Sequence, residues 1–342
     1  MIEKIQPLKW KVSHLELLDQ RYLPLEENVV KITTVEECYD AIKDMIVRGA
    51  PLIGSTGAYG AVLSIINNGD FEKDIKLLES ARPTAVNLSY ELHKCLEIYR
   101  NSHTEERLGK ILEYADFQYK KLEEHNYKMA EIAISELDKT LSKKQYNMMT
   151  ICNTGYLACG EIGTALGVIS VAHKKNKLIK AYPTETRPYL QGSRLTCYEL
   201  SKEEIPFDLI VEGAFSYVLE NKDIDAIFVG ADRIAKNGDT ANKVGTSTLS
   251  IVAKHFGVPF YVVAPTSSFD LESETGNDIE IEMRDESEVT AIFGKQISPL
   301  GTRALNPSFD ITRNDQITGI ICENGIIKNF DDGSLSEIVN GK

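Results

Sequence analysis

The sequence predicts an α/β protein, in which a small, mainly helical N-terminal domain with short strands precedes a domain built on a doubly wound, mostly parallel sheet. Two observations support this fold class. Apolar residues recur at helical spacing through most of the first third of the chain. Later, short apolar segments alternate with segments long enough for helices, a pattern typical of parallel sheets covered by helices. The pattern changes between residues 120 and 147, and we expect domains over 1–125 and 126–342.

The N-terminal domain is expected to begin with two or three short strands within residues 8–32, where apolar and polar residues alternate. Thr34 and Glu37 form a capping-box pattern, which predicts a helix over Val35–Val47. Two further helices are predicted over Ala85–Arg100 and Glu105–Asp138.

The C-terminal domain should contain six strands separated by helical segments. The predicted strands are Asn147–Ile151, Lys177–Tyr182, Phe207–Val211, Ala226–Val229, Pro259–Ala264 and Gly319–Cys322. The predicted helices include Ile162–Lys174 and Lys243–Phe256. Doubly wound sheets bind ligands in the crevice beyond the carboxyl ends of their strands, so the chemistry is expected there.

Composition restricts the possible partners. The net charge of -13 argues against a nucleic-acid partner, because a phosphate backbone requires a basic surface. No apolar stretch is long enough to span a membrane, and the first 20 residues lack the apolar core of a signal peptide, so we expect a cytoplasmic protein. The six cysteines form no C-x-x-C pair, which predicts free thiols and no zinc site.

The first strand end carries the segment "ICNTGYLACGEIGTALG", which places Cys152 directly after an apolar run. Its glycines do not have the G-x-G-x-x-G spacing of a dinucleotide site, so a nicotinamide-dependent oxidoreductase is disfavoured. The glycines taken alone favour close packing of a helix on the sheet. Cys152 taken alone is also more often a buried packing residue than a reactive one.

The second strand end reads "FVGADRIAKNGDTANKVGT" and places Asp232 at the mouth of the crevice. A helix cap, a partner for Arg233 and a catalytic acid/base group are all open roles for this carboxylate. Asn242 and Lys243 are predicted to open the following helix, where an anion or a hydroxyl group can bind.

Three arginine–proline units occur at Arg48–Pro51, Arg82–Pro83 and Arg187–Pro188, each with a proline suited to an early helical position. Gln191 and Arg194 follow the last unit closely. A guanidinium beside free backbone N–H groups suits a phosphate, so at least one unit is predicted to bind an anion.

These strand ends together suggest acid/base chemistry. Cys152 and Asp232 would face one crevice, and a thiol and a carboxylate can exchange protons with a sugar. No histidine lies in these motifs, which disfavours a hydrolase of the Ser–His–Asp or Cys–His type.

Seven segments, in order, resemble the methylthioribose-1-phosphate isomerase family, which is related to the regulatory subunits of translation initiation factor 2B. The resemblance covers about residues 8–330, and its segments are "RGAPLIGSTGAYG", "RPTAVNL", "CNTGYLACGEIGTALG", "ETRPYLQGSRLTCYEL", "VGADRIAKNGDTANKVGT", "PFYVVAPTSSFD" and "NPSFDITRNDQITGII". It implies a Rossmann-like C-terminal domain, usually in a homodimer, and isomerisation of 5-methylthioribose 1-phosphate to 5-methylthioribulose 1-phosphate in methionine salvage.

The resemblance also implies roles for individual residues, without a metal or a nucleotide cofactor. Cys152 and Asp232 correspond to the catalytic pair of the family. The implied substrate contacts are Arg48, Gly49, Ala50, Arg82, Gln191, Asn242 and Lys243.

The sequence departs from the family pattern at several positions that do not include the catalytic pair. These are Ser55–Gly57, Tyr90, Cys159, and Thr184 in place of an aspartate. Because small pocket changes shift selectivity by about 1–3 kcal/mol, isomerases of 5-deoxyribose 1-phosphate or ribose 1,5-bisphosphate are alternatives. A non-catalytic regulatory subunit is a further alternative, which the presence of both Cys152 and Asp232 disfavours.

Overall fold

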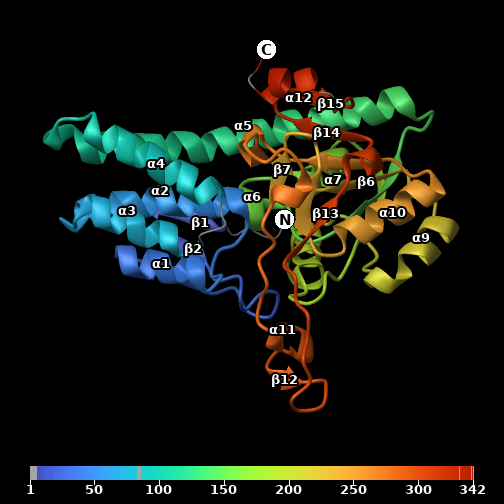
Figure 1. The fold of residues 1–342 in the computed structure, drawn as a ribbon, viewed down its shortest axis with the longest axis horizontal. Coiled ribbons are helices and arrows are strands. Elements are labelled where there is room, and N and C mark those ends of the chain that lie inside the picture. Colours follow the sequence, from blue (N-terminus) through green and yellow to red (C-terminus); the bar gives the residue numbers. More distant parts are fainter. Residues whose placement is uncertain (1–5, 83–85, 331, 340, 342) are drawn as a thin grey trace. The chain divides into compact units, whose positions relative to one another are not determined.

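A computed structural model describes residues 6–82, 86–330, 332–339 and 341 of the chain (Figure 1). The chain forms two compact units. The first unit contains Met1–Tyr127 and Thr154–Gly163, and the second contains Lys128–Asn153 and Thr164–Lys342. The expected division into domains 1–125 and 126–342 stays a prediction. Within the described ranges, no helix has both the length and the apolar character needed to cross a membrane.

The first unit combines a small antiparallel sheet with a group of helices, as predicted. Its strands follow the order β1 (Leu8–Lys11), β2 (His14–Leu18), β3 (Val29–Ile32). Its helices are α1 (Val35–Lys43), α2 (Ala50–Ile66), α3 (Phe71–Ser80), α4 (Val86–Arg100), the first part of α5 (Arg107–Thr140) and the short α6 (Tyr156–Cys159), with a 3-10 turn at Thr104–Glu106. The capping box at Thr34 and Glu37 is confirmed, because each side chain accepts a hydrogen bond from the other residue's backbone.

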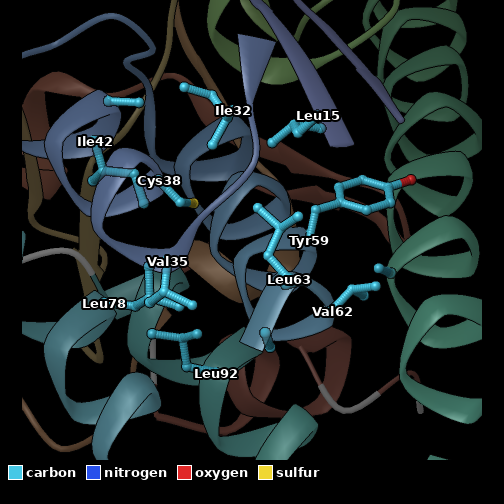
Figure 2. Packing of buried hydrophobic residues seen from close by; sticks show 14 of the residues in the cluster. Leu15, Ile32, Val35, Cys38, Ile42, Tyr59, Val62, Leu63, Leu78 and Leu92 are labelled. Carbon is cyan, nitrogen blue, oxygen red and sulfur yellow. The ribbon is translucent and has the colours of Figure 1, made fainter. Parts of the chain in front are cut away.

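One apolar core holds the first unit together. Figure 2 shows Tyr59, Val62 and Leu63 of α2 packed near Leu15 of β2 and Cys38 of α1. Helix α2 is apolar around most of its circumference, so it is buried between the sheet and the other helices. This burial fixes the first turn of α2, which contains one of the predicted anion sites.

The second unit is built on a six-stranded sheet. Its strands are β4 (Tyr146–Thr150), β5 (Leu178–Pro183), β6 (Ala226–Val229), β9 (Phe260–Val263), β14 (Gly319–Cys322) and β15 (Gly325–Ile327), in the spatial order β15-β14-β9-β6-β4-β5. All neighbours are parallel except β14 and β15. The five parallel strands therefore follow the doubly wound order 2-1-3-4-5, which confirms the predicted fold class.

Helices and short turns connect these strands. The helices are α7 (Ala165–Lys174), α8 (Cys197–Lys202), α9 (Phe215–Asn221), α10 (Thr246–Phe256), α11 (Ser287–Thr290) and α12 (Asp332–Val339), with a π-helical turn at Gly192–Thr196 and 3-10 turns at Glu212–Ala214, Thr266–Ser268, Gly276–Asp278 and Asn314–Gln316. Helices α9 and α10 pack side by side (Figure 1).

A second sheet of four short strands lies in the same unit. Its strands are β10 (Phe269–Asp270), β7 (Arg233–Ala235), β8 (Thr240–Lys243) and β13 (Phe309–Thr312), in that spatial order. A separate hairpin joins β11 (Ala291–Ile292) and β12 (Lys295–Gln296). The four-stranded sheet starts directly after the predicted catalytic Asp232.

Two predicted elements of this unit were wrong. Residues 207–211 are not a continuous strand, because only Phe207 and Ile210 form isolated bridges, to Ala181 of β5 and to Thr184 directly after it. Helix α10 begins at Thr246 and not at Lys243. Asn242 and Lys243 belong to strand β8 instead, because they pair with Asp310 and Phe309 of β13.

Candidate functional site

Cys152 lies in the turn that follows strand β4. Both its N–H and its C=O form hydrogen bonds with residues of the second unit. Its N–H donates to Thr186 Oγ1 at 2.9 Å, and its C=O accepts from Thr196 Oγ1 at 2.6 Å. The residue is 6% exposed and has a left-handed backbone with φ 65°. Non-glycine residues rarely adopt this conformation, so the surrounding contacts hold the cysteine in place.

Two further non-glycine residues in this region also have a left-handed backbone. Thr186 has φ 61° and Leu190 has φ 62°. For a β-branched threonine this conformation is unusual. Strained residues of this kind persist only where the surrounding structure holds them in place, and they cluster at functional sites. The turn after β4 and the segment after β5 therefore form one candidate site.

Gln191 follows directly after this strained segment. Its side chain is 5% exposed, and its Oε1 atom is buried without a hydrogen-bond partner. A buried acceptor without a donor costs about 1–3 kcal/mol, which a bound ligand that carries a hydroxyl group can recover. A ligand contact at Gln191 stays a prediction.

Asp232 follows strand β6 and lies directly before Arg233, where β7 begins to pair with β8. Its N–H donates to the C=O of Ala241 at 2.9 Å. Arg233 pairs with Ala241 across β7 and β8, so the same register sets Asp232 opposite Asn242. A strand and not a helix follows Asp232, so this carboxylate is not a helix cap. Arg233 forms an ion pair with Asp270 at 3.3 Å.

Asn242 and Lys243 lie in the middle of the four-stranded sheet. Asn242 is 3% exposed and donates from Nδ2 to Thr246 Oγ1 at 3.0 Å. The Lys243 ammonium lies 4.4 Å from the centre of the Phe309 ring, a cation–π contact that orients the side chain. Both residues therefore present polar groups from a rigid strand, and not from the start of a helix as predicted.

The N-terminus of α10 is not the open anion site that the sequence suggested. The Asp310 carboxylate accepts from the backbone N–H of Gly245 at 2.7 Å and of Ser247 at 3.0 Å. Burial raises the pKa of Asp310, although these two hydrogen bonds and the charge of Lys243 act against that rise. An internal carboxylate thus occupies the position where an external anion was expected.

The strand order brings the two predicted catalytic residues to adjacent strand ends. Cys152 follows the carboxyl end of β4, and Asp232 follows that of β6. These strands are parallel neighbours, with Met149 paired to Ile227. In a sheet of order 2-1-3-4-5 the switch point lies between these two strands, which is where doubly wound sheets bind their ligands.

The remaining predicted contacts belong to the first unit. Helix α2 begins at Ala50, has Pro51 in its first turn, and has no side-chain cap. Gly49 has φ 90°, and a Cβ atom there would lie only 2.7 Å from Ala158 Cα, so glycine is required. Arg48 is 9% exposed beside this turn. These features are those of an anion site at a helix N-terminus.

The other two arginine–proline units have different outcomes. Arg82 is half-buried, whereas Pro83–Ala85 of its motif lie outside the described residues. Arg187 donates to the C=O of Pro188 at 2.9 Å and of Val289 at 2.8 Å. Pro188 precedes the helical segment, which begins later, so the prediction of an early helical proline is wrong for this unit.

Sequence reasoning missed the threonines that hold Cys152. Thr186 and Thr196 lie 34 and 44 residues beyond the cysteine, and both are fully buried. Their only signal was their position in "TETRP" and "SRLT", beside the more prominent arginines. The described residues contain no group of three or more His, Cys, Asp or Glu side chains arranged to bind a metal ion.

Comparison with known proteins identifies the class of this protein. Residues 47–329 match the initiation factor 2 subunit family, so the chain belongs to that family. A solved structure of translation initiation factor eIF-2B, subunit delta, from A. fulgidus superposes with a TM-score of 0.85 at 35% identity, covering 98% of this chain and 100% of that one.

Other relatives identify the branch of the family, which is that of the methylthioribose-1-phosphate isomerases. The proteins of that name from Natranaerobius thermophilus and Bacillus cereus are 46% and 43% identical over 94% of this chain, and over 96% and 92% of their own lengths. The crystal structure of 5-methylthioribose 1-phosphate isomerase from Pyrococcus horikoshii has a TM-score of 0.91 at 35% identity, covering 99% of this chain and 97% of that one.

Proposed function

We propose that this protein is an aldose–ketose isomerase that converts 5-methylthioribose 1-phosphate to 5-methylthioribulose 1-phosphate. The observation that carries the proposal is the position of Cys152 and Asp232 after neighbouring parallel strands at the switch point of the sheet. The activity named for relatives at 42–46% identity supports the same reaction.

The reaction requires an acid and a base. The phosphate on C1 locks the sugar as a ring, so the bond between C1 and the ring oxygen breaks when that oxygen receives a proton. Hydrogen then moves from C2 to C1, and the C2 hydroxyl loses its proton to become a ketone. The moving hydrogen travels either as a proton through an enediol or directly as a hydride. No electrons are gained or lost overall, so no redox partner is needed.

In this proposal Asp232 donates the proton to the ring oxygen, and Cys152 is the second acid/base group or stabilises the transition state. A thiol and a carboxylate are both competent for such proton transfers. The 6% exposure of Cys152 supports its role, since the thiol would react away from bulk water.

The proposed substrate contacts divide by chemistry. Lys243 of the second unit supplies positive charge for the phosphate. Arg48, Gly49, Ala50 and Arg82 of the first unit stay substrate contacts that the family resemblance implies. Asn242 and Gln191 supply amide groups for the sugar hydroxyls. The unpartnered Oε1 atom of Gln191 supports that assignment.

We also propose that the protein acts in methionine salvage, in the cytoplasm, and as a homodimer. These three proposals rest on the family resemblance. Light scattering after size-exclusion chromatography would test the homodimer, because a mass near the 38.2 kDa of one chain would contradict it.

The experiment that tests the function compares kcat/KM for 5-methylthioribose 1-phosphate and 5-deoxyribose 1-phosphate. We expect a clear preference for the thioether substrate, and losses in kcat of at least about 100-fold for Cys152→Ala and for Asp232→Asn. A preference for the deoxy sugar would instead assign the protein to that substrate. No ketose from either sugar would favour a regulatory subunit, and near-normal turnover by both variants would refute the catalytic pair.

A further inference from the structure

Two hydrogen-bond chains converge on the peptide groups of Cys152. On the carbonyl side, Thr196 Oγ1 donates to the Cys152 C=O at 2.6 Å. The same hydroxyl accepts from Asn153 Nδ2 at 3.3 Å, so its single donor and one of its two acceptor lone pairs are used. Asn153 Nδ2 also donates to Glu199 Oε1 at 2.7 Å. This chain therefore ends on a carboxylate that is 2% exposed.

The second chain holds the amide side of the same residue. Cys152 N–H donates to Thr186 Oγ1 at 2.9 Å, and the Thr186 backbone N–H donates to Glu212 Oε1 at 2.6 Å. The Thr186 hydroxyl lies 3.1 Å from the hydroxyl of Thr184, which is also fully buried. This chain also ends on a carboxylate.

We propose that Thr186 and Thr196 are positioning residues, which fix the left-handed backbone of Cys152 and thereby aim its thiol at the substrate. Glu199, acting through Asn153, anchors the Thr196 side of this support. The inference rests on the proposed function, because it assigns a purpose to a fixed Cys152. It goes beyond that function, since it assigns a role to two residues that bond to the backbone of Cys152.

Cys152 needs these supports because its left-handed backbone is unfavourable for a non-glycine residue. A left-handed backbone costs a non-glycine residue of this kind roughly 1–2 kcal/mol, so a peptide without supports would relax toward negative φ. Such a relaxation rotates the Cα–Cβ bond and moves the thiol. Misplacement of a reacting group by about 1 Å lowers a rate by about 100-fold. Hydrogen bonds at both the N–H and the C=O of Cys152 oppose the relaxation.

The test uses Thr196→Val and Thr186→Val, which remove one hydroxyl each at nearly constant shape. We expect kcat to fall by roughly 10- to 100-fold while KM changes by less than about threefold. Thr196→Ser keeps the hydroxyl and should restore most of kcat. Thr318→Val is the matched control, because the Thr318 hydroxyl accepts from the Phe260 N–H at 2.9 Å at the opposite, amino end of strand β9. Its kinetics should stay those of the wild type.

A second measurement does not depend on turnover. Hydrogen exchange followed by mass spectrometry should show faster exchange at Cys152 in both valine variants, and no change in Thr318→Val. Unchanged exchange, a kcat within twofold of wild type, or an equal loss in Thr196→Ser would each overturn the inference. If the wild-type protein converts neither sugar, the proposed function fails, while the exchange result still decides whether these hydroxyls hold Cys152.

Discussion

Replacing Gly192 with alanine should damage both stability and activity, because the residue lies directly against the turn beside the site. An added Cβ atom would overlap the Thr184 carbonyl oxygen and lie 2.8 Å from its carbonyl carbon. It would also lie 3.0 Å from Thr186 Oγ1, which supports Cys152. Carbon atoms prefer separations of about 3.5 Å or more, so the backbone must shift by roughly 0.7 Å at least.

The expected magnitude follows from that shift. Overpacking against backbone costs up to about 3 kcal/mol, which lowers the melting temperature of a unit of roughly 200 residues by about 6–12 °C. Because Gln191 and Thr186 would move with the turn, kcat/KM should fall by roughly 10- to 100-fold. Thermal unfolding by circular dichroism and steady-state kinetics measure the two effects.

Gly109→Ala is the matched control for this experiment. Nothing lies within 4 Å of a Cβ atom at that position in helix α5. Alanine should therefore leave the kinetics unchanged and stabilise the helix by about 0.5–1 kcal/mol. If Gly192→Ala melted within 1 °C of the wild type and kept its kcat/KM, the close approach of Gly192 to Thr184 would be refuted.

Two further predictions concern stability. Burial acts to raise the pKa of Asp239, but hydrogen bonds from backbone N–H groups, Asn237 and Arg313 outweigh it and lower that pKa. The ionised carboxylate therefore stabilises the fold above its unfolded pKa of about 3.9, and this contribution is lost as the pH falls through the folded-state pKa. Asp239→Asn should cost about 2 kcal/mol at pH 7 and much less at pH 2 in urea unfolding, whereas an equal cost at both pH values would contradict this reasoning. Thr34→Ala should lower the free energy of unfolding by about 1 kcal/mol, because it removes the hydroxyl that accepts from the Glu37 N–H. Thr34→Ser keeps that hydroxyl and should lose little stability. Equal losses in the two variants would exclude the hydroxyl as the cause.

Local patterns predicted most elements because their causes are local. The capping box fixed the start of α1 at Val35, and the apolar run of β6 was predicted at its observed bounds, Ala226–Val229. Periodicity and caps act within a few residues, so they can be found in the sequence. The same reasoning placed Cys152 and Asp232 after strands, because each follows a short apolar run.

Long-range pairing explains the errors. "TANKVGT" has the composition of a helix start, yet strand β13, more than 60 residues later, pairs with Asn242 and Lys243 and delays α10 until Thr246. Asp310 of that strand then occupies the helix N-terminus. Nothing within the local segment signals this partner, because strand pairing depends on register with a distant part of the chain.

The sequence by itself determined the class of fold, the family motifs and the residue types that can carry acid/base chemistry. Only the tertiary structure decided that β4 and β6 are neighbours on either side of the switch point, with Cys152 and Asp232 after them. It also decided that hydroxyl groups from Thr186 and Thr196 hold the cysteine in a left-handed conformation. Strand order and hydrogen bonds between distant residues arise from packing of the whole unit, so a local pattern cannot encode them.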